Sequence, residues 1–224
     1  MITNNQALIA LIATTIINFI LTMYLTKGKN KNQLSKIFIC ALSLLILWSI
    51  GLIAQITLAE PLNIEPIYFD YFVYIPICFV PVTVFFMGVI FANTKIKFKK
   101  KYLLLFIVPI ISLLVLWTND YHHLFYKNYS ININEATYGL YFYIYSTYSY
   151  LLFGISFVEL IKYSIKNAGV FSKQALLFLL GSLIPILANV LAFSGIIQTN
   201  IYLMIILLKY LYFIIMMVSL YVFY

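Results

Sequence analysis

Long apolar runs constrain this sequence more than any other feature. Seven segments are apolar on every side of a helix, and each is about 20 residues long, enough to cross a hydrocarbon layer of roughly 30 Å. Backbone polar groups in lipid must be satisfied within the protein, and the runs lack the alternation of barrel strands, so each run predicts a helix. The expected fold is an all-α membrane protein, a single seven-transmembrane helix bundle over residues 1–224. The predicted spans are 7–26, 37–59, 71–92, 102–118, 141–161, 174–195 and 201–224.

Composition excludes a soluble protein. Hydrophobic residues make up 64% of the chain and charged residues 9%, which is far from the balance of a soluble domain. A net charge of +8 would suggest nucleic acid as the partner of a soluble protein, but in a membrane protein it is better explained by topology. We therefore expect the lipid bilayer as a partner and no nucleic acid.

The charges alternate between the loops. The loops at 27–36, 93–101 and 162–173 hold 12 of the 14 basic residues, whereas the loop at 60–70 holds only acids. The positive-inside rule then places the N-terminus outside and the C-terminus in the cytoplasm. The first span has no basic segment before it, so we expect a retained helix and not a signal peptide. All 14 basic residues are lysine, which suggests a bacterial source and a multi-pass protein of the bacterial plasma membrane.

Glycines and prolines recur inside the predicted spans. We expect Gly51, Gly88, Gly154 and Gly181 to be sites where helices pack closely. Prolines inside helices leave a backbone carbonyl without its usual donor and predict kinks. These prolines are Pro76 and Pro81 in the third span, Pro109 in the fourth and Pro185 in the sixth.

The longest loop, from 119 to about 140, contains both histidines in the stretch WTNDYHHLFY. His122 and His123 are adjacent, so on a helix their side chains diverge by about 100°, and no third ligand or nucleophile motif lies nearby. An interfacial structural role is favoured over metal binding, catalysis or pH sensing, with no cofactor, metal or catalytic residue expected. In this interpretation Trp117, Tyr121 and Tyr126 are interface anchors, and Asn119 or Asp120 caps a helix end.

The segment that follows, YSININEATYG, predicts a hairpin. Its two short β-prone runs flank Asn134 and Glu135, so we expect a small hairpin lying over the bundle.

Several of these pieces resemble a known family. TNDYHHLFY, the aromatic span YGLYFYIYSTYSYLLFGISFVELIKYS and the sixth-span piece IPILANVLAFSGI are similar to the N-terminal seven-transmembrane region of bacterial membrane histidine kinases, a sensor region also found joined to diguanylate cyclases. Further matching pieces are LILWSIGLIAQI and YFVYIPICFVPVTVFFMGVIFANT. The signature residues are Asn119, His122, His123, Leu124 and Phe125.

The resemblance implies a seventh helix that leads into a kinase or cyclase, whereas this sequence ends at Tyr224. The output domain is therefore expected outside this chain, which alone is expected not to be an enzyme. Homodimerisation through that cytoplasmic part is implied by the family only.

Polar groups inside the spans are costly in hydrocarbon and mark candidate binding residues. Most lie toward the outer side of the predicted bundle, where an outward-opening pocket with one cation at its floor is expected; Asn18 is nearer mid-membrane. Tyr138 begins a tyrosine stripe along the fifth span. Simple packing or hydrogen bonding between helices is the competing explanation. Lys209 is either a ligand or switch residue, or it reaches the surface or pairs with Asp70 or Asp120. The candidates are Lys209, Asn189, Tyr145, Tyr148, Tyr141, Gln55, Asp70 and Tyr74.

We therefore expect a sensory receptor module that binds a small or lipid-borne signal in the outer half of the bundle and relays it through the seventh helix. A small transporter built as three, one and three helices is the alternative, because the first three and last three spans share an orientation. The apolar inner halves argue against a polar path across the membrane. A non-catalytic membrane assembly partner is the second alternative.

Overall fold

The computed structural model describes residues 4–28, 32–93, 96–97, 99–131 and 135–166, together with Leu179 and Leu183. Apart from these two leucines, the sixth and seventh predicted spans lie outside the described residues. Lys209, Asn189, Gly181 and Pro185 are therefore not placed.

Helices dominate the described residues. The elements are α1 (Asn4–Lys27), α2 (Gln33–Leu58), α3 (Pro66–Asn93), the 3-10 helix η1 (Lys100–Phe106), α4 (Ile107–Trp117), α5 (Asn119–His122), β1 (Tyr126–Asn128), β2 (Thr137–Tyr138) and α6 (Leu140–Lys166). Within this described part of the chain, five stretches are long and apolar enough to cross a membrane, and η1 with α4 forms one of them. These five coincide with the first five predicted spans, which are thereby confirmed as helices.

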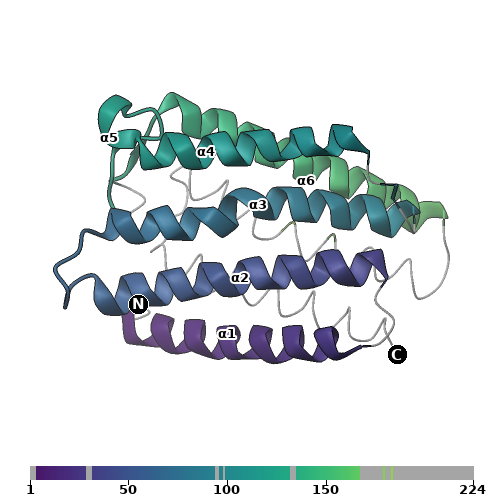
Figure 1. Cartoon of the computed structure of the whole chain (residues 1–224), viewed down its shortest axis with the longest axis horizontal. Helices are drawn as coiled ribbons and strands as arrows, with labels where there is room; N and C mark the ends of the chain where they lie inside the picture. The colour runs from purple at the N-terminus through teal and green to yellow at the C-terminus, as the bar shows by residue number, and fades with distance from the viewer. Residues whose placement is uncertain are drawn as a thin grey trace.

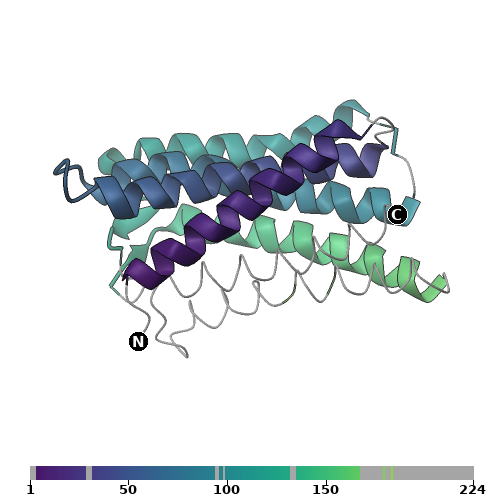
Figure 2. The same ribbon diagram turned by 90° about the horizontal axis from the view of Figure 1, so that it is seen from below.

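Helix α3 lies at the centre of the arrangement. In Figure 1, α1 lies beside α2 and α2 beside α3, while α4 and α6 pack on the other side of α3. Figure 2 shows that α1 crosses the bundle obliquely. Helices α2, α4 and α6 each contact α3.

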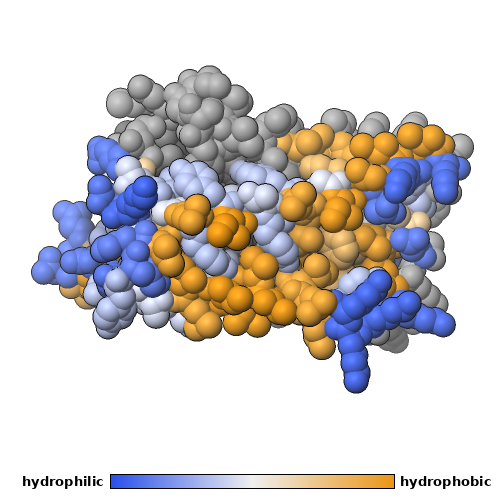
Figure 3. Space-filling view, turned by 90° about the horizontal axis from the view of Figure 1, so that it is seen from above, coloured by the Kyte–Doolittle hydropathy of each residue, from blue (hydrophilic) through white to orange (hydrophobic). Residues whose placement is uncertain are grey.

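The bundle has two chemically different ends. One, which we call the hairpin end, carries the α2–α3 turn, α5 and the hairpin of β1 and β2; the other, the lysine end, carries the α1–α2 and α3–η1 connections and the last turn of α6. The face in Figure 3 shows a hydrophobic band in orange between hydrophilic side chains at both ends. Apolar residues such as Leu103 and Ile110 are 67% and 51% exposed, as expected for side chains that face lipid.

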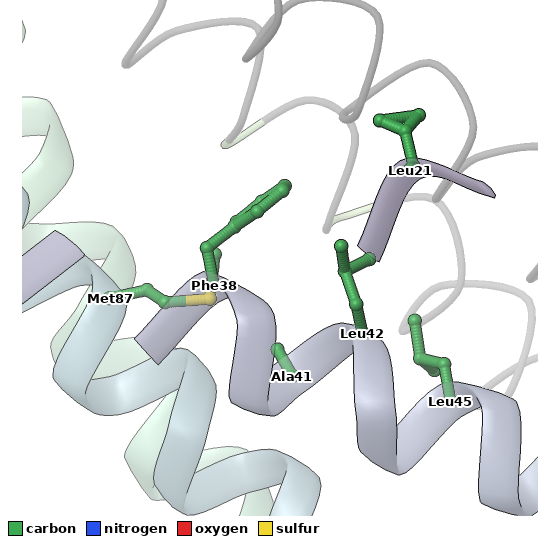
Figure 4. Close-up of a cluster of buried hydrophobic side chains, with 6 residues drawn as sticks. All are labelled: Leu21, Phe38, Ala41, Leu42, Leu45 and Met87. Carbon is green, nitrogen blue, oxygen red and sulfur yellow. The ribbon is translucent and has the colours of Figure 1, made fainter. Parts of the chain in front are cut away.

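The apolar core is divided among the helix contacts. In one cluster, Leu21 of α1 packs with Phe38, Leu42 and Leu45 of α2 and with Met87 of α3 (Figure 4). Leu42 has no exposed surface. This cluster joins the first three helices near the lysine end.

The predicted hairpin is confirmed, but it begins earlier than the sequence indicated. β1 and β2 are antiparallel, and Tyr126 lies opposite Tyr138. The strands thus begin within the WTNDYHHLFY stretch. The Gly139 N–H donates to the carbonyl of Phe125 at 2.8 Å, which ties the start of α6 to the hairpin.

The start of the fourth span differs from the expectation. The fourth span begins as the 3-10 helix η1 and becomes α-helical only at Ile107, just before Pro109. Helix α3 is continuous through Pro76 and Pro81, and the kinks expected there stay a prediction.

The glycines in the spans do not behave alike. A Cβ added to Gly51 would lie 2.7 Å from Val73, and one added to Gly88 would lie 2.9 Å from the Cα of Ser156, so both positions are confirmed as close-packing sites. A Cβ at Gly154 would meet nothing within 4 Å. The expectation for Gly154 is wrong, because this residue is exposed on the surface of α6.

The contrast between two of these glycines predicts opposite effects of the same substitution. Gly88→Ala is expected to destabilise the purified protein by about 1–3 kcal/mol, because the new methyl group overlaps the Ser156 backbone. Gly154→Ala is the matched control and is expected to be neutral or stabilising by up to about 1 kcal/mol. Thermal unfolding in detergent measures both, and equal loss from the two variants would contradict the packing of α3 against α6.

Candidate functional site

A buried glutamine and a neighbouring acid join three elements at the hairpin end. The Nε2 atom of Gln55 donates to Asp70 Oδ1 at 2.9 Å and to the carbonyl of Pro66 at 3.1 Å, and it lies 3.4 Å from the Tyr129 hydroxyl. Tyr129 also hydrogen-bonds the Asp70 carboxylate. We call Gln55, Asp70 and Tyr129 the polar cluster; it connects α2, α3 and the segment after β1.

The polar cluster contains an acid without a cationic partner among the described residues. Their single ion pair joins Lys162 to Glu159 near the far end of α6. The Asp70 carboxylate is held by neutral donors, an amide and a hydroxyl. A group that brings a donor or a positive charge would therefore find complementary chemistry here.

Aromatic side chains lie next to the polar cluster, and we call Tyr74, Phe125 and Tyr126 the aromatic layer. The hydroxyls of Tyr74 and Tyr126 share a hydrogen bond of 2.8 Å, and Tyr74 stacks edge to face on Phe125 with 5.1 Å between ring centroids. Phe125 has no exposed surface. The hairpin is thus anchored to α3 through one hydroxyl pair and a set of ring contacts.

Asp70 also influences the hairpin electrostatically. Burial, and next the negative charge of Asp70, raise the pKa of Tyr138 to about 12. The same two causes, in the same order, raise the pKa of Tyr126 well above its usual value. Both hydroxyls therefore stay protonated at neutral pH.

Asn119 organises the turn that carries the histidines. Its side-chain oxygen accepts from the N–H groups of Phe125 and Tyr126 at 2.9 and 3.0 Å, and its Nδ2 donates to the Tyr126 carbonyl at 3.0 Å. Asn119 is only 4% exposed. The expectation that it caps a helix is wrong, because its side chain closes the turn onto β1 instead.

The interface anchors separate into two groups. Trp117 and Tyr121 are exposed, at 46% and 90%, and thus lie where an interface anchor would. Tyr126 is only 5% exposed, so its assignment as an anchor is wrong. Sequence alone cannot tell these residues apart, because all three are amphipathic aromatics in one short stretch.

Both nitrogens of the first histidine have partners within the loop. His122 Nδ1 accepts from the Leu124 N–H at 3.0 Å, and Nε2 lies 3.1 Å from the Thr118 hydroxyl. His123 is the C-terminal cap of α5, in a left-handed conformation at φ 53°. Leu124 is 41% exposed, and its carbonyl accepts from the Tyr141 N–H at 2.9 Å. The signature residues therefore shape the turn, and within the described residues no group of three potential metal ligands occurs.

The tyrosine stripe of α6 faces the prolines of its neighbours. Pro81 has no N–H to donate to the carbonyl of Ile77, and the Tyr145 hydroxyl donates to that carbonyl at 3.1 Å. Pro109 likewise lacks a donor for the carbonyl of Leu105, to which the Tyr148 hydroxyl donates.

Two further contacts extend this seam. Tyr141 lies 3.3 Å from the Ser112 hydroxyl, and Ser156 donates to the Val84 carbonyl at 3.0 Å. The side chains of α6 therefore satisfy backbone and hydroxyl groups of α3 and the η1–α4 span.

The predicted binding residues thus fall into separate sets. Gln55 and Asp70 meet directly, and Tyr74 lies in the aromatic layer beside them. Tyr145 and Tyr148 hydrogen-bond to neighbouring helices, and Lys209 and Asn189 lie outside the described residues. Asn18 is buried at 4% exposure in α1. Sequence reasoning missed Tyr129, whose only signal was its place next to the predicted hairpin.

A family model for the N-terminal 7TM region of histidine kinase matches residues 10–223. The chain belongs to this family. The comparisons with curated proteins and with solved structures give no match. As a 7TM region of a histidine kinase, the chain is a sensory membrane module and a multi-pass membrane protein, and this region is the non-catalytic part of such kinases.

The proline–tyrosine pairing in this 7TM region predicts a measurable coupling. Tyr145→Phe is expected to cost about 1 kcal/mol, because the Ile77 carbonyl loses its donor. Pro81→Ala restores an N–H in the helix, so the same Tyr145→Phe change should cost much less in that background.

A double-mutant cycle of thermal stability in detergent isolates this coupling. Tyr143→Phe is the control on the same helix, since Tyr143 is 57% exposed, and it should behave identically in both backgrounds. Additive effects of Tyr145→Phe and Pro81→Ala would show that the hydroxyl does not serve the carbonyl left by the proline.

Proposed function

We propose that this chain is the sensory module of a bacterial signal-transduction protein of the histidine kinase type. In this proposal the bundle has seven spans in the bacterial plasma membrane, with the N-terminus outside. A small or lipid-borne signal binds at the hairpin end, and the seventh helix relays its binding to a cytoplasmic output domain. The output domain, the signal and a homodimer formed through the cytoplasmic part all belong to the proposal.

The polar cluster is the observation that carries this proposal. Gln55, Asp70 and Tyr129 come from α2, α3 and the hairpin segment, so one small group of hydrogen bonds fixes three elements relative to one another. Polar and acidic side chains inside membrane helices are costly and are usually kept for function. A ligand that changes the partners of Asp70 would therefore change how these three elements pack.

Helix α3 supplies a route away from the hairpin end. Asp70 and Tyr74 lie in its first turns, and Ile77 and Val84 further along accept hydrogen bonds from α6. The Gly88–Ser156 contact continues the same seam toward the lysine end. A rotation or shift of α3 at one end would thus change its contacts with α6 at several points along the helix.

The relay needs two arrangements of different ligand affinity. A ligand that binds both equally shifts nothing, and moving the equilibrium from 1:99 to 99:1 requires roughly 10⁴-fold preference. The hydrogen bonds at Asp70 and Ile77 are suited to such a difference, because each is a single contact that is either made or broken.

The orientation can be tested independently of signalling. We use two single-cysteine variants in a background without Cys40 and Cys78. Lys127→Cys places its thiol at the hairpin end, and Lys101→Cys places its thiol at the lysine end. A membrane-impermeant maleimide added to intact cells should label the cysteine at 127 and not the one at 101. Labelling in the reverse pattern would invert the proposed topology.

The polar cluster is tested by Asp70→Asn in the chain joined to a histidine kinase catalytic part. The change removes the charge but keeps the size, so it should alter autophosphorylation in membranes severalfold without reducing thermal stability by more than about 1 kcal/mol. Asp120→Asn is the control, because Asp120 is an exposed acid at the same end.

Wild-type phosphorylation from both variants would remove the polar cluster as the signal site. Equal change from both would instead indicate a general effect of charge at the hairpin end.

A further inference from the structure

The lysine end has an excess of positive charge that the protein itself does not balance. Among the described residues this end carries one acid, Glu159, and its carboxylate already pairs with Lys162 at 2.9 Å. The other described acids, Glu60, Glu65, Asp70, Asp120 and Glu135, lie toward the hairpin end. The described lysines at this end are Lys27, Lys36, Lys97, Lys99, Lys100, Lys101, Lys162 and Lys166.

Half of these lysines lie close together in the sequence: Lys97 and Lys99 on the connection after α3, and Lys100 and Lys101 at the start of η1. The side-chain amide of Gln33, in the first turn of α2, pairs with both backbone groups of Ile96: the Ile96 N–H donates to Oε1 at 2.8 Å, and Nε2 donates to the Ile96 carbonyl at 3.0 Å. These bonds tie the connection after α3 to the start of α2.

The Ile96 side chain strengthens this anchor. It is only 7% exposed and packs with Val82, Phe86, Ile90 and Leu152. Lys97 and Lys99, by contrast, are exposed on the same connection. A buried isoleucine next to the exposed Lys97 fixes this point of the chain against the bundle.

The residues that follow are apolar and exposed. Leu103 and Leu104 in η1 are 67% and 64% exposed, and Ile107 at the start of α4 is 46% exposed. Leu103 and Leu104 follow Lys101 after one residue, Tyr102. One short segment therefore presents positive charge and, a turn further on, a hydrocarbon surface.

We propose that Lys97 and Lys99–Lys101, with the exposed leucines that follow them, form a binding site for the headgroups of anionic phospholipids. A phospholipid offers a phosphate and acyl chains in the same order as the segment offers ammonium groups and leucines. The acyl chains of a lipid held at the lysines would lie against these lipid-facing leucines, whereas a soluble anion would contact only the lysines. The charge excess supports an anionic lipid over a zwitterionic one.

The Gln33–Ile96 pair makes this a defined site and not only a region of positive potential. Diffuse attraction depends on the number of charges near the membrane and not on the conformation of one connection. If binding depends on this conformation, a variant that breaks the Gln33–Ile96 hydrogen bonds must weaken lipid binding although every lysine is still present. Gln33 is therefore a positioning residue for the site.

The experiment uses the full chain in lipid nanodiscs, where both membrane faces are accessible. Nanodiscs of phosphatidylcholine are compared with nanodiscs that contain increasing phosphatidylglycerol, and lipid retained by the protein after extraction is counted by native mass spectrometry. The wild type is expected to retain phosphatidylglycerol in preference to phosphatidylcholine.

Matched variants separate the site from charge in general. Lys97→Gln, Lys99→Gln, Lys100→Gln and Lys101→Gln together are expected to lower the preference by about tenfold or more, because these ammonium groups pair with the bound headgroup. Lys27→Gln, Lys36→Gln, Lys162→Gln and Lys166→Gln together remove the same charge from the same end and are expected to change it less than threefold.

Two further variants control for folding and geometry. The first variant keeps the positive charge and should retain the preference; it carries Lys97→Arg, Lys99→Arg, Lys100→Arg and Lys101→Arg. Gln33→Leu keeps every lysine and should lower the preference severalfold with little loss of thermal stability.

Three results would overturn the proposal. Equal loss from the two lysine sets would show diffuse attraction. An unchanged preference in Gln33→Leu would show that lipid binding does not depend on the conformation held by the Gln33–Ile96 hydrogen bonds. Displacement of the bound lipid by inorganic phosphate at equal concentration would show a site for a soluble anion.

Discussion

The packing of α3 in the bundle depends on the hydrogen bond from the Tyr145 hydroxyl to the Ile77 carbonyl. Inside hydrocarbon every backbone polar group has to be satisfied by the protein, and Pro81 leaves this carbonyl without a donor from its own helix. Helix α3 is in contact with α2, α4 and α6, so its backbone cannot simply bend toward water. The tyrosine of α6 allows a proline-containing helix to occupy the centre of the structure.

This dependence assigns different roles to polar residues that look alike in the sequence. Tyr145 and Tyr148 satisfy carbonyls on neighbouring helices, whereas Tyr129 and Gln55 satisfy a carboxylate. The first kind of contact secures the packing. The second holds a buried carboxylate between α2, α3 and the segment after β1.

The features that follow from length, polarity and charge could be predicted from the sequence. The first five spans and the hairpin agree with the structure, because a hydrocarbon layer sets the length of its helices. Features that depend on three-dimensional neighbours could not be predicted. Gly88 faces Ser156 while Gly154 faces nothing, and no local pattern distinguishes the two. Asn119 looked like a helix cap because caps are local, but its partners lie six and seven residues away.

The partners of Asp70 would also restrict the chemistry of the signal that we propose to bind at the hairpin end. The carboxylate is held by the Gln55 amide and the Tyr129 hydroxyl, and a buried charged group that loses a donor pays the full cost of its desolvation. A purely apolar ligand that displaced Tyr129 would therefore oppose its own binding. A ligand that replaces Tyr129 has to carry a hydrogen-bond donor or a positive charge. An apolar or lipid-borne signal has to act through the aromatic layer around Phe125 instead, leaving the carboxylate with its donors.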